Sequence, residues 1–454
     1  RFFFQPFFKR MFRLFKEGVE DLVLCSSPSN GEITKQLGAR FDRELIYTAI
    51  GEVLVSVNPY KYLPITGSEH IAMYRNSSGQ GQQPPHVFAL AERAYRRLVD
   101  DGDSQCVIIS GESGAGKTVA AKLILNYITA VSPSGGGGGG GMSSPPPQSA
   151  PPPTRGRGGP PIPGGRGGRG GNRMSVARGR GGRGAPRGGP PSRGGPPSRG
   201  GGGGGTKSVD EIKKIILESN PLMEAFGNAK TVRNDNSSRF GKYLEIQFND
   251  NSAPVGGVTS TFLLEKTRVA YQGKNERNFH IFYQLVKGSL AEKYGVDEPI
   301  ENFQYLNNSG CFDADDIDDV EEFNEVLESF DIIGFNEDEK DWLFKIIAAI
   351  LKLGNLEFEG TSDESGSIIK NPKLVEEISI LLDVNEDKLA ESVLSRWFVI
   401  RGQEPTKIPF KPHEAKDACD ALAKAIYGEV FNWLVKRINQ SVEVKKGNTK
   451  NFIG

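Results

Sequence analysis

Two polar segments of the chain carry residue types that can hold the phosphates of a nucleotide. The first fits the pattern G-x-x-x-x-G-K-[ST] and reads Gly111-Glu112-Ser113-Gly114-Ala115-Gly116-Lys117-Thr118. Glycines in such a loop allow backbone geometries closed to other residues, so that N–H groups point inward at phosphate oxygens. We expect Lys117 to reach the β- and γ-phosphates and the Thr118 hydroxyl to bind Mg²⁺.

The flanks of this loop are those that the motif requires. Residues 106–110 form a short apolar run with β-branched side chains, which predicts a buried parallel strand. Residues 119–128 continue with helical spacing, and the positive end of that helix would face the phosphates. A glycine-rich turn that matches by chance would not need this order of strand, loop and helix.

The second segment reads Asn234-Asp235-Asn236-Ser237-Ser238-Arg239-Phe240-Gly241. Alone it predicts a polar loop, and most such loops bind nothing. Residues 242–248 leave it with the alternation of a strand. Its two hydroxyls suit a hard cation, and its arginine suits a closing salt bridge.

With these surroundings the chain closely resembles the myosin motor head. Residues 111–118 are similar to the P-loop of that family, and residues 219–248 to its switch I region. The resemblance runs from about Gly18 to Gly454 with one long interruption, and further matches lie at 50–60, 85–91 and 276–285. Because little sequence precedes Gly18 to form the small β-barrel of many conventional myosins, the chain looks most like the N-terminal portion of a class I heavy chain.

The resemblance implies the cofactors ATP and Mg²⁺ and a role for each polar residue of the second segment. Ser238 would be the second protein ligand to Mg²⁺, opposite Thr118. Asn234 and Ser237 would touch the γ-phosphate, with Ser237 near the attacking water. Arg239 would pair with an acidic residue of switch II when the site closes. Together with Lys117 these residues are the candidate catalytic groups of an actin-activated ATPase.

The adenine side of the site is less clearly marked. The resemblance implies that Asn58-Pro59 opens the loop along the purine, although a turn after a buried strand explains the same dipeptide. Myosins commonly carry a tyrosine eight residues after that asparagine, where this chain has Thr66; Tyr60 and Tyr62 come earlier in the loop.

Composition separates one long segment from the rest. The net charge is zero, yet residues 132–205 hold eleven arginines, thirty glycines and no Lys, Asp or Glu. The other residues therefore carry 45 basic against 56 acidic side chains. We expect the segment to be disordered, because it cannot bury a core. The resemblance makes it an expanded loop 1 that influences nucleotide release; binding of RNA or acidic surfaces and a solvated spacer stay open as alternatives.

The resemblance implies an α/β fold: a P-loop NTPase core with a mixed, mostly parallel twisted sheet flanked by helices, and a largely helical upper 50 kDa subdomain. Helical spacing at 321–329, 337–353 and 414–435 agrees with the latter. The expected organisation is a Phe/Arg-rich segment at 1–17, the N-terminal head at 18–131, the insert at 132–205, switch I at 206–249 and the upper 50 kDa region at 250–454.

Two further segments attract attention. Residues 313–319 contain five aspartates but lack the glycine and glutamate spacing of a calcium loop, so we expect the acidic start of a helix. Glu404 lies sixteen residues before Asp420, where the resemblance places an acidic or phosphorylatable residue on the actin-facing surface. It would supply permanent negative charge there, although an ordinary exposed glutamate explains it as well.

The remaining features bear on location and partners. Four cysteines without paired spacing fit a reducing cytosol, and no apolar run approaches a membrane span. Residues 1–16 could lie on a membrane surface or pack on the head. The resemblance implies a cytoplasmic protein of the actin cytoskeleton, with light chain or calmodulin on a lever and membrane on a tail.

The sequence stops where a myosin would supply Asp-x-x-Gly-Phe-Glu of switch II, so we expect this polypeptide alone to be impaired as a motor. The alternative function is an Arg-Gly-rich RNA- or polyanion-binding protein that uses a myosin-like nucleotide fold as a scaffold. Lys117, Thr118, Ser238 and Arg239 argue against it, since a decayed scaffold need not keep them together. A P-loop kinase or GTPase is disfavoured because no guanine-reading motif is evident and because the extended resemblance to the myosin head leaves little room for either.

Overall fold

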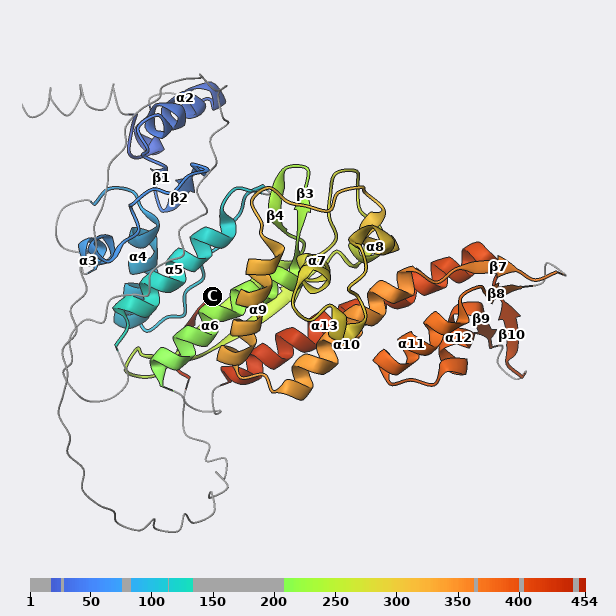
Figure 1. Ribbon diagram of the computed structural model, residues 1–454. Helices are drawn as coiled ribbons and strands as arrows, with labels where there is room; N and C mark the ends of the chain where they lie inside the picture. The colour runs from blue at the N-terminus through green and yellow to red at the C-terminus, as the bar shows by residue number, and fades with distance from the viewer. Residues whose placement is uncertain are drawn as a thin grey trace, which may run out of the picture. The chain divides into compact units, whose positions relative to one another are not determined.

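The computed structural model describes residues 18–25, 28–75, 83–112, 114–133, 208–362, 366–399, 404–443 and 449–454 (Figure 1). Three expectations fall wholly or largely outside these ranges. They concern the Phe/Arg-rich segment 1–17, Ser113 of the glycine-rich loop, and the insert 132–205, of which only Ser132 and Pro133 are described.

The described N-terminal part consists of short strands and helices, the last of which follows the glycine-rich loop. Its elements are η1 Leu22–Leu24, α2 Asn30–Phe41, β1 Tyr47–Ile50, β2 Val53–Ser56, α3 Ser68–Tyr74, α4 Val87–Asp100 and α5 Lys117–Val131. Helix α4 packs on α5, where the rings of Phe88 and Tyr127 lie 5.0 Å apart. The Tyr127 hydroxyl also donates a hydrogen bond to Glu92, a carboxylate buried in α4. The expected helix at 119–128 is therefore confirmed.

The middle of the chain forms a long helix followed by two hairpins. These elements are α6 Val209–Gly227, β3 Asn228–Thr231, β4 Asn234–Ser238, β5 Gly241–Phe248 and β6 Pro254–Phe262. Helix α6 begins with a capping box in which Ser208 and Glu211 each accept a hydrogen bond from the other's backbone N–H. Strand β5, expected from the alternation at 242–248, pairs antiparallel with β6 on one side and with β11, Asn451–Ile453, on the other.

The mostly parallel sheet that we expected is not found among the described residues. The five small sheets there contain antiparallel ladders only. Residues 106–110 do not form a strand; Gln105 makes a parallel bridge to Ile453, and Val107 N–H donates to the Gly454 carbonyl over 2.8 Å. The coarser expectation of an α/β fold holds.

The C-terminal half is largely helical. Its helices are η3 Lys266–Val269, α7 His280–Lys287, η4 Glu292–Tyr294, η5 Ile300–Asn302, α8 Gln304–Asn307, α9 Asp319–Ile333, α10 Glu337–Gly354, α11 Pro372–Leu382, α12 Glu386–Leu394 and α13 Pro412–Ser441. The strands between them are β7 Phe358–Gly360, β8 Ser367–Ile369, β9 Ser395–Phe398 and β10 Thr406–Pro409. Helices α9, α10 and α13 confirm the three helical segments that the spacing predicted.

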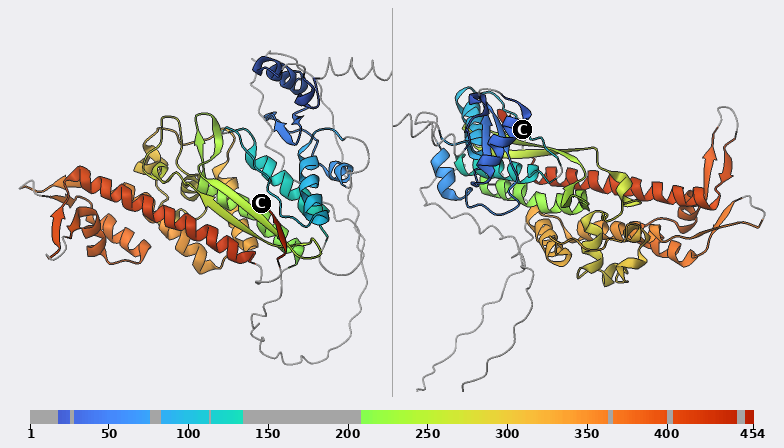
Figure 2. Two further views of the ribbon diagram at one scale, coloured as in Figure 1. Left: turned by 180° about the vertical axis from the view of Figure 1, so that it is seen from behind. Right: turned by 90° about the horizontal axis from the view of Figure 1, so that it is seen from above.

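Helix α13 connects this half to the hairpins. Its Tyr427 ring stacks on Phe279 and Phe282 of the α7 region, with centroids 4.8 and 5.3 Å apart. The helix packs against strand β6 (Figure 2). Its Asn439 side chain exchanges two hydrogen bonds with the backbone of Thr259 in that strand. The four cysteines are free, as the sequence indicated. Within the described ranges, no helix is long and apolar enough to cross a membrane.

Candidate nucleotide-binding site

The glycine-rich loop has the backbone geometry that phosphate binding requires. Gly114 and Gly116 adopt φ of +78° and +87°, which other residues adopt only with strain, and α5 starts directly after them at Lys117. The Lys117 ammonium turns back over the loop and donates to the carbonyls of Gly111 and Glu112 at 2.7 and 2.8 Å. Lysine and helix N-terminus therefore face the same loop, as the motif predicted.

The loop that opens at Asn58-Pro59 contacts this glycine-rich loop directly. Asn58 Nδ2 donates to the Gly114 carbonyl over 2.6 Å, and its Oδ1 accepts from Tyr60 N–H over 3.1 Å. Tyr60 has φ of +49° and is 81% exposed, with its hydroxyl 3.6 Å from where a Cβ on Gly114 would lie. Asn58 is thus more than a turn residue, whereas Thr66 is half-buried and no contact of it with the loop is seen.

The second polar segment is a strand rather than the loop that its composition suggested. Asn234–Ser238 form β4, which pairs with β3 in a tight hairpin. The Asn234 side chain lies 3.7 Å from the position of a Cβ on Gly114. The exposed Arg233, at the hairpin tip, approaches Glu112 to 3.5 Å. Three segments far apart in the sequence therefore meet at Gly114.

A cavity of about 380 Å³ lies behind this meeting point, between α5, α6 and β5. Its polar wall includes Lys117, Thr118 and Ser238, so both expected metal ligands face one space. Asn58, Asn234 and Ser237 are outside the described lining; the first two approach the loop at Gly114 instead.

Arg239 has an acidic partner that the sequence did not reveal. Its Nε lies 2.7 Å from Glu265 Oε2, and its Nη1 donates to the hydroxyl of the buried Ser237 over 3.2 Å. Burial raises the pKa of Glu265, but hydrogen bonds from Arg239 and Arg268 outweigh it and lower that pKa. No sequence signal marks Glu265, which is 26 residues away along the chain and becomes adjacent only when β6 pairs with β5.

Two lysines add positive charge to the cavity wall. Lys122 of α5 forms an ion pair of 2.8 Å with Glu224 of α6. Lys242 donates to Asn220 Oδ1 over 2.7 Å, and burial lowers its pKa to about 8 although the charge of Glu224 acts in the opposite direction. Both lysines line the same cavity as Thr118. Because Glu224 lines the cavity as well and neutralises Lys122, the positive charge on its polar side comes from Lys117 and Lys242.

The donor set also fits Mg²⁺. Thr118 and Ser238 offer two hydroxyl oxygens to one space, and Mg²⁺ commonly takes few protein ligands and completes its shell with phosphate oxygens and water. Among the described residues, no cluster of three or more His, Cys, Asp or Glu side chains could hold a metal by itself. A cation here would therefore depend on a phosphate ligand.

Residues 19–454 match the family model of the myosin head (motor domain). The chain belongs to the myosin head family. It is 49% identical to the myosin-K heavy chain of Dictyostelium discoideum, over 97% of this chain and 59% of that protein. It is 38% identical to the myosin IB heavy chain of the same organism and 39% identical to a myosin-1 of Sclerotinia sclerotiorum. These alignments cover 97% and 96% of this chain but 34% and 30% of those proteins.

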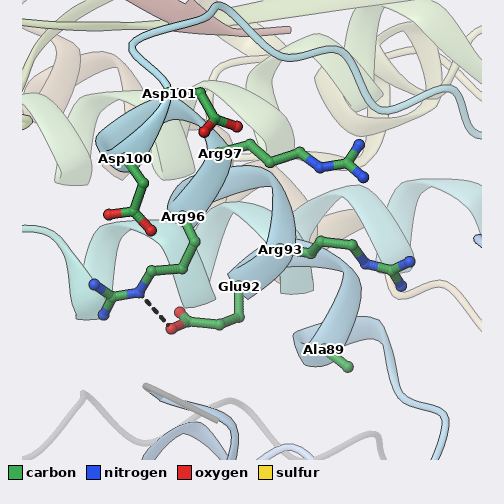
Figure 3. Close-up of a pocket in the computed structure, with 7 residues that line it drawn as sticks. All are labelled: Ala89, Glu92, Arg93, Arg96, Arg97, Asp100 and Asp101. Carbon is green, nitrogen blue, oxygen red and sulfur yellow. Dashed lines mark hydrogen bonds and ion pairs between the residues drawn. The ribbon is translucent and has the colours of Figure 1, made fainter. Parts of the chain in front are cut away.

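Two other surface features of this myosin head lie outside the nucleotide site. Glu404 is exposed and precedes β10, whose partner β9 carries the exposed Trp397 and Phe398. A smaller hollow of about 250 Å³ lies on α4 (Figure 3), lined by Ala89, Glu92, Arg93, Arg96, Arg97, Asp100 and Asp101. Arg96 is paired with Glu92 there, and none of the lining residues comes from the P-loop or β4. This hollow is separate from the nucleotide site.

Proposed function

We propose that this chain is the ATP-binding portion of an actin-based motor of class I, which couples Mg²⁺-dependent ATP hydrolysis to binding of and movement along actin filaments. The observation that carries the proposal is the meeting of the P-loop, Asn58 and Asn234 at Gly114, beside a cavity that exposes both Thr118 and Ser238. Membership of the myosin head family indicates ATP hydrolysis as the reaction. The similarity to the myosin-K and myosin IB heavy chains favours class I.

The residues divide into four roles in this proposal. The P-loop backbone and Lys117 hold the phosphates, while Thr118 and Ser238 hold Mg²⁺, which would neutralise charge on the phosphates. Ser237 and Asn234 position the γ-phosphate and the attacking water. Arg239 would exchange Glu265 for an acidic group of switch II as the site closes. Catalysis of this kind rests on positioning and on stabilisation of charge.

A magnesium titration tests this function. Nucleotide affinity of the chain is measured against Mg²⁺ concentration for the wild type, Thr118→Val and Ser238→Ala. We expect each variant to need about tenfold more Mg²⁺, because each loses one oxygen ligand. Thr118→Ser, which keeps the hydroxyl, should restore the wild-type dependence. Unchanged magnesium dependence in both variants would refute the assignment of this metal site.

The proposal extends to partners and location. Actin would bind the surface that includes Glu404, and the whole protein would act in the cytoplasmic actin cytoskeleton. For the whole class I protein, we also propose a lever that binds a light chain or calmodulin and a tail that binds membranes.

A further inference from the structure

The acidic segment 313–318 is joined to the phosphate-binding strand β4 through Asp235. Asp235 Oδ2 accepts the backbone N–H of Asp315 over 2.8 Å, and its Oδ1 forms an ion pair with Lys230 of β3. Asp235 and Lys230 are about one-sixth exposed. Burial raises the pKa of Asp235, but Lys230 and the N–H groups of Asp315 and Asp316 outweigh it and lower the pKa. The carboxylate is therefore charged when it makes both contacts.

Asp235 lies at an irregular point of the hairpin. Ala229 pairs with Ser237, and Thr231 pairs with Asn234, so Lys230 alone faces both Asp235 and Asn236. This is a β-bulge in β4, and bulges commonly re-aim side chains beside active sites. The short β3–β4 ladder does not fix the bulge at one residue by its backbone hydrogen bonds alone. If the bulge were lost, the pairing beyond it would shift by one residue, and Ser237 and Ser238 would exchange faces.

Contacts from outside the ladder hold the two bulge residues. Asn236 Oδ1 accepts from Asn228 Nδ2 over 2.7 Å, and its Nδ2 donates to Glu224 of α6 over 3.2 Å. His280 Nε2 lies 3.3 Å from the same Asn236 oxygen. Asp235 is held by Lys230 and by the acidic segment. Each bulge residue thus has its own anchor outside β4.

The far end of the acidic segment is fixed by a buried ion pair. Asp319, the first residue of α9, receives two hydrogen bonds from Arg277, at 2.5 and 3.1 Å, and both side chains are almost fully buried. Arg277 N–H in turn donates to the Lys230 carbonyl over 3.0 Å. The contacts close a ring from Asp235 through Asp315, Asp319, Arg277 and Lys230 back to Asp235. The start of α9 and the β3–β4 hairpin therefore stabilise each other's position.

We propose that Asp235 is a positioning residue that fixes the β4 bulge against the acidic segment 313–318 and thereby sets which of Ser237 and Ser238 faces the γ-phosphate and which the metal. This inference rests on the proposed function of the site. Asp235 itself contacts no phosphate; it acts through the register of β4. Movement at the start of α9 would reach the serines through the same contacts.

The test compares the affinities of the full 454-residue chain for Mg²⁺-ADP and for a non-hydrolysable Mg²⁺-ATP analogue. At a saturating Mg²⁺ concentration, which offsets a weakened Ser238 ligand, Asp235→Ala should weaken binding of the ATP analogue about tenfold and of ADP less than twofold, because only the ATP analogue carries the γ-phosphate. Asp315→Pro, which removes the N–H donor from the other side of the contact, should reproduce this loss. Asp315→Ala keeps that donor and serves as the matched control, with wild-type affinities.

Each outcome decides one question. Equal loss of both nucleotides in Asp235→Ala would show a merely structural role and overturn the inference, as would no loss at all. Hydrogen exchange without nucleotide should accelerate at residues 234–238 in Asp235→Ala and not in Asp315→Ala; unchanged exchange would also overturn it. A wild-type chain that binds neither nucleotide would overturn the proposed function, and the inference with it.

Discussion

Asn58 reaches from its own loop to the P-loop, where its Nδ2 donates to the Gly114 carbonyl over 2.6 Å. This hydrogen bond links the Asn58 loop, which we propose lies along the purine, to the P-loop at a glycine whose φ is +78°. Because Asn58 Oδ1 also accepts from Tyr60 N–H, the amide orients the aromatic residue that stands beside the loop. The contact brings an Asn-Pro dipeptide 53 positions before Gly111 directly against the P-loop.

Asn58→Ala should therefore weaken nucleotide binding about tenfold, the usual consequence of losing one or two well-formed hydrogen bonds in a site. Asn58→Asp should weaken it further, since a carboxylate would face the Gly114 carbonyl. Equilibrium binding of Mg²⁺-ADP measures both effects. Tyr62→Ala, an exposed residue of the same loop, is the control and should bind as the wild type does. Full affinity in Asn58→Ala would remove Asn58 from the site.

The ion pair of Arg277 and Asp319 should be the most sensitive charged pair for folding. Asp319→Ala leaves a guanidinium with 0% exposure without its carboxylate, which costs about 3–5 kcal/mol for buried pairs of this kind. Urea unfolding followed by circular dichroism measures the change. Asp313→Ala removes the 86% exposed partner of Lys287 and should cost less than about 1 kcal/mol. Equal costs for the two variants would contradict this account.

His86 should make the fold sensitive to acid. Its Nδ1 accepts from Phe88 N–H and its Nε2 lies 3.0 Å from the Ile65 carbonyl, while burial lowers its pKa from 6.5 to about 4. As the pH falls, His86 takes up a proton in the unfolded chain before it does so in the folded protein. The free energy of unfolding that neutral His86 contributes is therefore fully present above about pH 6.5 and is lost towards pH 4. The loss amounts to about 3 kcal/mol.

Unfolding free energies of the wild type and His86→Gln, compared between pH 7 and pH 4, isolate this contribution from that of His280, whose pKa is also lowered by burial. The wild type should lose about 3 kcal/mol more than the variant over that interval. Parallel curves would show that His86 does not carry the effect.

Glu404 provides a prediction for the actin side. It is exposed in the loop that connects β9 to β10, so its replacement should not affect folding. In an intact motor, Glu404→Ala should reduce actin activation of the ATPase, because the negative charge proposed to face actin is lost. Glu404→Asp, which retains the charge, should keep activation. Equal activation in all three proteins would make Glu404 an ordinary surface residue.

The sequence predicted those parts of the molecule that depend on local chemistry. Helices α5, α9, α10 and α13 followed from apolar spacing, and the P-loop followed from its glycines and Lys117. The acidic segment was predicted to start a helix, and Asp318 does cap α9 by accepting from Val320 and Glu321 N–H. Such features are decided within a few residues, so a single sequence can show them.

What the sequence did not predict depends on pairing between distant segments. Residues 106–110 were expected to be a strand, but a strand needs a partner, and their backbone bonds end at Val107. The β3–β4 hairpin was hidden by its polar composition, which is unusual for strands. Glu265 reaches Arg239 only through the pairing of β5 with β6. None of these contacts leaves a periodic signal in the chain.

The most direct test of the central claim is calorimetric titration of the purified chain with Mg²⁺-ATP, in the wild type and in Lys117→Ala. The wild type should bind one nucleotide with magnesium dependence, and Lys117→Ala should lose at least tenfold in affinity, because Lys117 is the cation of the P-loop. Lys122→Ala, one turn further along α5 and paired with Glu224, should lose less. A wild type that does not bind, or Lys117→Ala that binds as tightly as the wild type, would contradict the account.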